Sequence, residues 1–86
     1  MTTHLIINQA RIKKEGRKNT LLLDELILML KDSESKKYAV GIECTNIDYD
    51  IKFYGEIERL KNLKKFSKLR WAEKYFNKLV DRKEVL

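Results

Sequence analysis

The chain contains no proline, three glycines and a single cysteine among 86 residues. The scarcity of proline and glycine argues against flexible linkers and low-complexity tracts, and no internal repeat is visible. Cys44 stands alone and cannot form an internal disulfide, which is typical of a reducing, cytoplasmic setting. The length suffices for one small hydrophobic core, so we expect a single small domain over residues 1–86.

Long apolar runs are also missing. The longest, residues 21–30, is interrupted by Asp24 and Glu25, and a helix that crosses a bilayer needs about 20 apolar residues. The first residues lack a basic region followed by a long apolar run, so no secretory signal is expected. These absences predict no membrane partner and a cytoplasmic location.

Side chains suited to catalysis are scarce. His4 is the sole histidine, and without a neighbouring cysteine or second histidine we expect a surface residue and no zinc site. Cys44 has no neighbouring base or helix N-terminus in the sequence that would stabilise a reactive thiolate. We therefore expect it to act as a small, partly buried apolar residue. The sequence has no nucleophile elbow, Walker A loop, dinucleotide-binding glycine pattern or EF-hand. We therefore expect no catalytic residue, no metal, no cofactor and no enzymatic activity.

Charge, by contrast, is abundant and unevenly distributed. The net charge is +6. Between Arg59 and Lys83 there are ten basic and two acidic residues, a net charge of +8 for that segment. A second basic cluster occupies residues 11–18, and residues 43–58 are acidic on balance. The molecule is therefore expected to have basic and acidic surfaces in different places.

Three segments have the alternating pattern of β-strands. They are residues 5–12, 38–44 and 47–53, in which every second side chain would point to the same face of an extended chain. All three are rich in β-branched or aromatic residues. Only Thr45 and Asn46 separate the last two segments, so we predict a 38–53 hairpin with a tight turn.

Helical patterns account for most of the rest. Residues 20–31 predict a helix, because Leu and Met dominate and Thr20 can cap its first turn. A strand that pairs with residues 5–12 across Gly16 is the alternative. Ile57, Leu60 and Leu63 predict a short helix.

A last helix is expected after a break near Phe66, with Ser67 as its cap and Phe66 packed on Trp71. Its apolar face would bury one group of residues: Leu69, Ala72, Phe76, Leu79 and Val80. The predicted fold class is α+β, a small antiparallel sheet that includes the 38–53 hairpin and is packed by the C-terminal helix. A homodimer would follow if the Leu-rich face of residues 20–31 exceeded what the sheet can cover.

The strongest functional indication is a basic row on the last helix. Arg70, Lys74 and Lys78 recur every four residues opposite the apolar face, with Arg82 beside them and Trp71 at the border. Such a row can neutralise phosphates, and a tryptophan can stack on a base, although lysine-rich helix faces are often simply solvated. The N-terminal cluster would supply a second phosphate-binding arm: Arg11, Lys13, Lys14, Arg17 and Lys18. We therefore predict a small basic accessory protein that binds nucleic acid or a nucleoprotein complex.

Two other classes of function remain open. Glu43, Asp48 and Asp50 form an acidic patch that could contact a basic partner, as in an inhibitor of a host enzyme or defence nuclease of the anti-CRISPR kind. The high Lys, Asn and Ile content favours an AT-rich genome such as that of a phage or plasmid. Asp50 and Lys52 could also belong to a Mg²⁺-dependent nuclease centre, but the polar face of any alternating strand carries such charges.

Overall fold

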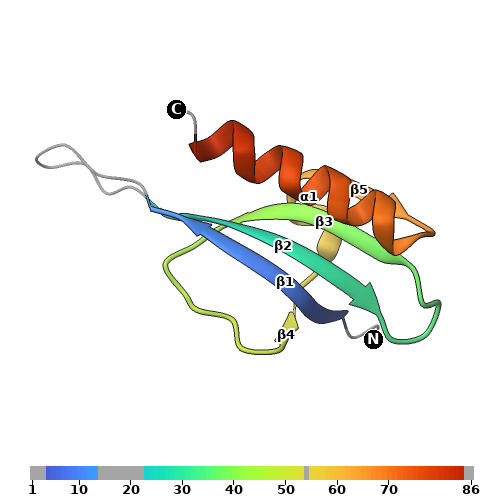
Figure 1. Ribbon diagram of the computed structural model, residues 1–86. Coiled ribbons are helices and arrows are strands. Elements are labelled where there is room, and N and C mark those ends of the chain that lie inside the picture. The colour runs from blue at the N-terminus through green and yellow to red at the C-terminus, as the bar shows by residue number, and fades with distance from the viewer. Residues whose placement is uncertain (1–3, 14–22, 54, 85–86) are drawn as a thin grey trace, which may run out of the picture.

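The computed structural model describes residues 4–13, 23–53 and 55–84. It contains a five-stranded antiparallel sheet with one long helix packed on it (Figure 1). The strands follow the spatial order β4-β1-β2-β3-β5. In chain order the elements are β1 (His4–Ile12), β2 (Glu25–Asp32), β3 (Tyr38–Cys44), β4 (Lys52–Phe53), the 3₁₀ turn η1 (Ile57–Arg59), β5 (Lys61–Phe66) and α1 (Leu69–Glu84). The predicted α+β class is confirmed.

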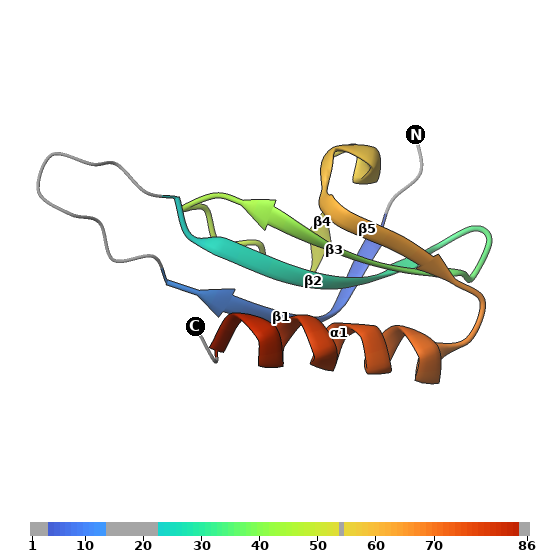
Figure 2. The ribbon, with the colours of Figure 1, turned by 90° about the horizontal axis from the view of Figure 1, so that it is seen from above.

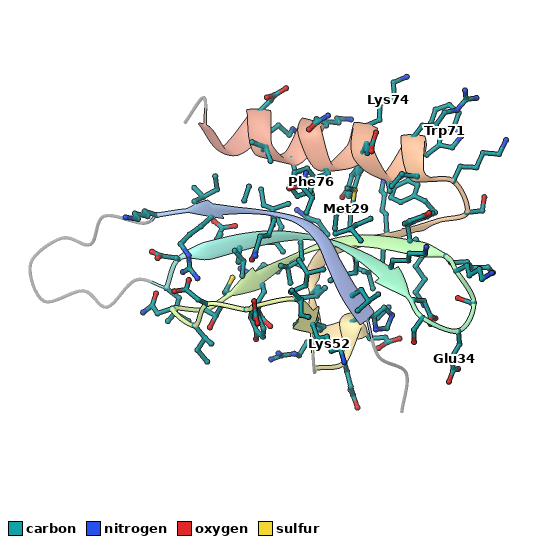
Figure 3. All side chains as sticks on the ribbon, turned by 60° about the horizontal axis from the view of Figure 1, so that its bottom comes forward. Met29, Glu34, Lys52, Trp71, Lys74 and Phe76 are labelled. Atoms are coloured by element: carbon teal, nitrogen blue, oxygen red, sulfur yellow. The ribbon has the colours of Figure 1, made fainter. Side chains whose placement is uncertain are left out.

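Each face of the sheet is covered by a different layer. Helix α1 follows the length of the sheet on one side, which we call the helix face (Figure 2). Ala72, Phe76 and Leu79 of α1 are buried there against the side chains that β2 and β3 direct to this side, such as Ile27. Figure 3 shows Phe76 and Met29 meeting between helix and sheet. Residues 45–53 and 55–60 cross the opposite side, which we call the loop face, and bury a second core: Leu26, Leu28, Leu30, Ala39, Phe53, Ile57 and Leu60.

The central strand β2 is where the prediction of a helix over residues 20–31 is wrong. β2 pairs with β1 on one side and with β3 on the other. Its five residues from Leu26 to Leu30 are buried, with alternate side chains in the two cores. Leu and Met favour helices weakly, and burial between two covered faces outweighs that preference. The alternative, a strand paired with the first one, is confirmed, although Thr20 and Gly16 lie outside the described residues.

The predicted 38–53 hairpin is also wrong. β3 pairs with β2 and β5, and the two-residue β4 pairs with β1 at the far edge of the sheet. Thr45 and Asn46 make no tight turn. Instead the backbone N–H of Thr45 donates to the Asp24 carbonyl at 2.9 Å, and the Asn46 side chain accepts from the Asp24 N–H at 3.1 Å. These bonds direct the chain across the loop face.

Two further elements differ in part from expectation. Ile57 and Leu60 are buried as predicted, but the short helix is only the 3₁₀ turn η1 and is followed by β5. Strand β1 is confirmed, with a bulge between Ile6 and Asn8. A bulge exchanges the faces of the residues on its two sides. Ile6 therefore packs in the loop-face core, while Ala10 and Ile12 pack in the helix-face core.

Candidate nucleic-acid interface

Helix α1 presents the predicted basic row to solvent. Its core-facing residues Ala72, Phe76 and Leu79 point into the sheet, so the residues on the opposite side of the helix are exposed. Figure 3 shows Lys74 and Trp71 on the outer side of α1. The four predicted cations of this helix are all exposed: Arg70, Lys74, Lys78 and Arg82.

Trp71 lies among these cations and not under Phe66. The Arg70 guanidinium is 5.5 Å from its ring centroid and the Lys74 ammonium is 5.3 Å from it. The predicted packing of Phe66 on Trp71 is replaced by a pair one turn later, in which Phe66 and Tyr75 have ring centroids 5.7 Å apart. Helix α1 begins at Leu69, and the Lys68 carbonyl accepts its first hydrogen bond, so the start lies one residue beyond that implied by Ser67 as the cap. Trp71 is left 46% exposed and can contact a ligand.

Strand β5 contributes two further lysines that the sequence did not indicate. Lys64 pairs with Val40 and Lys61 with Ile42, so both lie on the helix face of the edge strand. The Lys64 ammonium is 4.9 Å from the Tyr75 ring, and the Tyr75 hydroxyl donates to the Asn62 carbonyl at 2.7 Å. A strand prediction for residues 61–66 would have been needed to place these lysines beside α1.

Tyr75 therefore connects the cations of β5 to those of α1, since Trp71 and Tyr75 are one helical turn apart. We call this combined surface the basic face. Its members are Lys61, Lys64, Arg70, Trp71, Lys74, Lys78 and Arg82. Six of the seven side chains carry a positive charge, and the seventh is the sole tryptophan.

Arg11, predicted as part of a phosphate-binding arm, is engaged with acidic side chains on the loop face. Its guanidinium pairs with Asp24 at 3.2 Å and with Asp48, and it donates to the Ile47 carbonyl at 2.9 Å. The side chain is only 21% exposed, because it lies on the loop face where it holds residues 45–48 against the sheet. Lys13 is exposed, whereas Lys14, Arg17 and Lys18 lie outside the described residues.

The predicted acidic patch is divided by the fold. The Glu43 side chain is only 9% exposed, and its Oε2 accepts from Arg59 at 2.7 Å and from the Tyr49 hydroxyl at 3.1 Å. Asp48 is paired with Arg11, and Asp50 is exposed. Within residues 4–13, 23–53 and 55–84, no group of three or more His, Cys, Asp or Glu side chains is arranged to hold a metal ion.

Two apolar side chains accompany these acids in the loop of residues 45–51. Ile47 is 63% exposed and Ile51 is 61% exposed. The alternating pattern of residues 47–53 therefore buries only part of its apolar set, namely Tyr49 and Phe53. An acidic loop with exposed isoleucines thus lies on the side of the sheet opposite α1.

The sequence predicts no functional role for His4 and Cys44, and the structure agrees with the expected burial of only one of them. His4 is 7% exposed, so the expectation of a surface histidine is wrong. It is buried because β1 pairs it with Asp32 of β2 on one side and with Phe53 of β4 on the other. Cys44 is a free, partly buried thiol, as expected.

No helix among the described residues is long and apolar enough to cross a membrane. No protein-family model, curated protein or solved structure matches this chain.

Proposed function

We propose that this protein binds nucleic acid, alone or within a nucleoprotein complex, through the basic face, and that it does so without catalysing a reaction. The observation that carries the proposal is the convergence of cations from two elements around an exposed tryptophan. Lys64 of β5 lies against the Tyr75 ring, and Arg70 and Lys74 of α1 both lie near the ring of Trp71, one helical turn before Tyr75.

The chemistry of this surface suits a phosphate backbone with accessible bases. Lys and Arg side chains displace the counterions that surround phosphates, and this release favours binding. An exposed indole offers a flat surface on which a base can stack. The bases of a single strand are accessible for this contact, whereas the bases of a duplex are already stacked on each other. A single-stranded ligand therefore uses both features of the basic face.

The proposal is tested by titrating single-stranded DNA and RNA into the protein while recording the fluorescence of Trp71. The double variant Lys74→Glu/Lys78→Glu should bind more weakly and should lower the slope of log affinity against log salt by about 2 or more. Lys36→Glu/Lys52→Glu is the matched control, because it makes the same charge change at two exposed residues outside the basic face. Equal affinity of wild type and the Lys74/Lys78 variant would overturn the proposal.

A second function is favoured by the exposed isoleucines of residues 45–51. Ile47 and Ile51 beside Asp48 and Asp50 have the mixture of apolar and acidic side chains that can contact a basic protein, as an inhibitor of a nucleic-acid-binding enzyme would. Salt separates the two functions. Phosphate binding weakens steeply as salt rises, whereas a partner held by apolar contacts stays bound.

A pull-down from the source cell with and without nuclease treatment provides the same distinction. Recovery of nucleic acid, with co-purifying proteins lost on nuclease treatment, supports the basic face as the binding surface. One stoichiometric protein that survives nuclease and high salt supports the inhibitor. In that case Ile47→Asp should release the partner, while Lys74→Glu/Lys78→Glu should not.

A further inference from the structure

A small cavity opens at the end of the sheet where β2 turns into β3. Its volume is about 170 Å³, and His4, Asp32, Ser35, Lys37, Ile57 and Lys65 contribute to its wall. A water molecule occupies about 30 Å³ in the liquid, so the space suits a group of a few heavy atoms. Figures 1 and 2 both place this turn at the same end of the sheet as the start of α1.

The histidine of this cavity has an unsatisfied nitrogen. Nδ1 of His4 is shielded from solvent and has no hydrogen-bond partner among the described residues. A buried polar atom without a partner costs about 1–3 kcal/mol, so proteins rarely keep one without a reason. The imidazole can turn about its broad χ2 torsion, which would bring a ring nitrogen to face the cavity that the ring already lines.

The charges around the cavity favour an anion. Lys37 and Lys65 contribute two ammonium groups, and Asp32 is the carboxylate of the wall. The Asp32 oxygens are already engaged, since they accept from the Glu34 N–H at 2.8 Å and from the Ser35 hydroxyl at 2.9 Å. These two bonds lower the pKa of Asp32 and keep it ionised. The carboxylate therefore serves the turn. Lys65 also forms an ion pair with Glu58 at 3.9 Å, in which both side chains are exposed, so an anion in the cavity would compete with Glu58 for this ammonium group.

We propose that this cavity binds a phosphate group between Lys37, Lys65 and the His4 ring. A tetrahedral oxyanion has several acceptor oxygens, so it can take charge-assisted hydrogen bonds from both ammonium groups and one from an imidazole N–H. The source is either free phosphate or the terminal phosphate of a nucleic acid. The second source rests on the proposed function, because a strand bound on the basic face would pass around this end of the sheet to reach the cavity, whose wall includes Ala39 and Ile57 of the loop face.

The single histidine makes this site directly observable. The ring protons of His4 give one set of NMR signals in the full chain, and these are followed as sodium phosphate is added at fixed pH and constant ionic strength. We expect a saturable shift that sodium chloride does not produce. A shift that never saturates, or one that chloride reproduces, would overturn the site.

Variants assign the binding to the cavity. Lys37→Ala/Lys65→Ala changes two exposed side chains, so the fold should be retained, and phosphate affinity should fall at least about tenfold. Lys36→Ala/Lys52→Ala is the matched control, with the same loss of charge at residues that do not line the cavity. Equal loss of affinity in both double variants would show a general charge effect and would refute the site.

Oligonucleotides identify the source of the phosphate. If a 5′-phosphorylated single strand shifts the His4 signals and its unphosphorylated counterpart does not, the terminal phosphate is the ligand. If inorganic phosphate alone saturates the shift, the ligand is a free anion, and this result holds whether or not Lys74→Glu/Lys78→Glu alters strand binding. No saturable shift with either phosphate source refutes the cavity as a site and leaves the basic face untested by this measurement.

Discussion

Arg59 of η1 holds the buried carboxylate of Glu43 on β3, with Nη2 and Oε2 2.7 Å apart. The Tyr49 hydroxyl donates to the same oxygen at 3.1 Å, and Tyr49 also packs on Phe53 with ring centroids 5.4 Å apart. This group attaches residues 45–53 and 55–60 to the loop face of the sheet. Glu43, which the sequence predicts in an acidic surface patch, is thus largely buried and helps to hold the loop on the sheet.

Replacement of Glu43 should therefore destabilise the fold. In Glu43→Ala the Tyr49 hydroxyl and the Arg59 guanidinium both lose their acceptor, and we expect a loss of about 1–3 kcal/mol in the free energy of unfolding. The lower half of this range is favoured, because Arg59 is 53% exposed and water can replace part of its pairing.

Urea unfolding measures this loss. Asp50→Ala removes an exposed carboxylate from the same region and should change the unfolding free energy by less than about 0.5 kcal/mol. If the two variants are equally stable, the Glu43 group does not hold the loop to the sheet.

Tyr49 should make stability depend on alkaline pH. Partial burial, and next the hydrogen bond to Glu43, raise the pKa of Tyr49 above its ordinary value of 10.0. The folded protein therefore keeps the phenol proton to higher pH than the unfolded chain. The corresponding stability is complete below pH 10 and is lost as the pH rises through the folded pKa.

Thermal unfolding of wild type and Tyr49→Phe between pH 8 and pH 11 isolates this contribution, because the lysines titrate in both proteins. The gap in unfolding free energy between the two should narrow above about pH 10. A gap that stays constant across this range would contradict the assignment.

Gly41 of β3 should not tolerate a side chain. A Cβ atom at this residue would lie 2.7 Å from the Cβ of Leu60, which crosses the loop face there. Gly41→Ala should therefore force the chain near Leu60 away from β3 and destabilise the protein by about 1–3 kcal/mol.

Gly55→Ala is the matched control for this substitution. There the nearest atom, also at 2.7 Å, is Nη2 of Arg59, so Gly55→Ala should disturb the ion pair with Glu43. Arg59 is 53% exposed and water can replace part of this pairing, whereas the Cβ of Leu60 can move only with the backbone. Chemical denaturation of both variants should show the larger loss for Gly41→Ala, and the opposite order would show that Leu60 does not restrict β3.

Trp71 should contribute to strand binding through its ring. Trp71→Ala should lower the affinity for single-stranded DNA by about 1–3 kcal/mol, the usual contribution of one stacked base, and Trp71→Phe should retain most of it. Because both variants lack the indole, binding is followed by the anisotropy of a labelled oligonucleotide, and circular dichroism confirms that the fold is kept. A Trp71→Ala variant with wild-type affinity would show that the indole does not stack on bases.

The last helix was predictable because its information is local. Ala72, Phe76 and Leu79 lie three or four apart and define one buried face, although Leu69, predicted to belong to it, is 40% exposed. The basic row opposite follows from the same geometry. The predicted members Arg70, Lys74, Lys78 and Arg82 are exposed for this reason. Lys61 and Lys64 join them only through the pairing of β5 with β3, which no local pattern contains.

The central strand was not predictable by the same means. A strand buried on both faces loses the alternation that identifies strands, and residues 26–30 consist of Leu, Ile and Met, which also suit a helix. Residues 47–53 show the reverse case. Their alternation is clear, but Tyr49 and Phe53 pack beneath the sheet with only two residues, Lys52 and Phe53, in a strand.

Arg11 shows why the surroundings of a basic residue do not follow from its neighbours in sequence. A run of basic residues suggests a common exposed role, yet the partners of Arg11 are Asp24, Asp48 and the Ile47 carbonyl, far away in sequence. Only the sheet topology brings these groups together. The same topology buries His4, whose neighbours come from β2 and β4.

The sheet separates two surfaces that differ in chemistry. The cations belong to α1 and β5, and the exposed isoleucines belong to residues 45–51, a segment that crosses the opposite side of the sheet (Figure 1). A molecule bound over α1 and β5 therefore leaves Ile47 and Ile51 accessible. Two macromolecules could be held at once, separated by little more than the thickness of this small protein. If both proposed surfaces are used, occupancy of one need not compete with occupancy of the other.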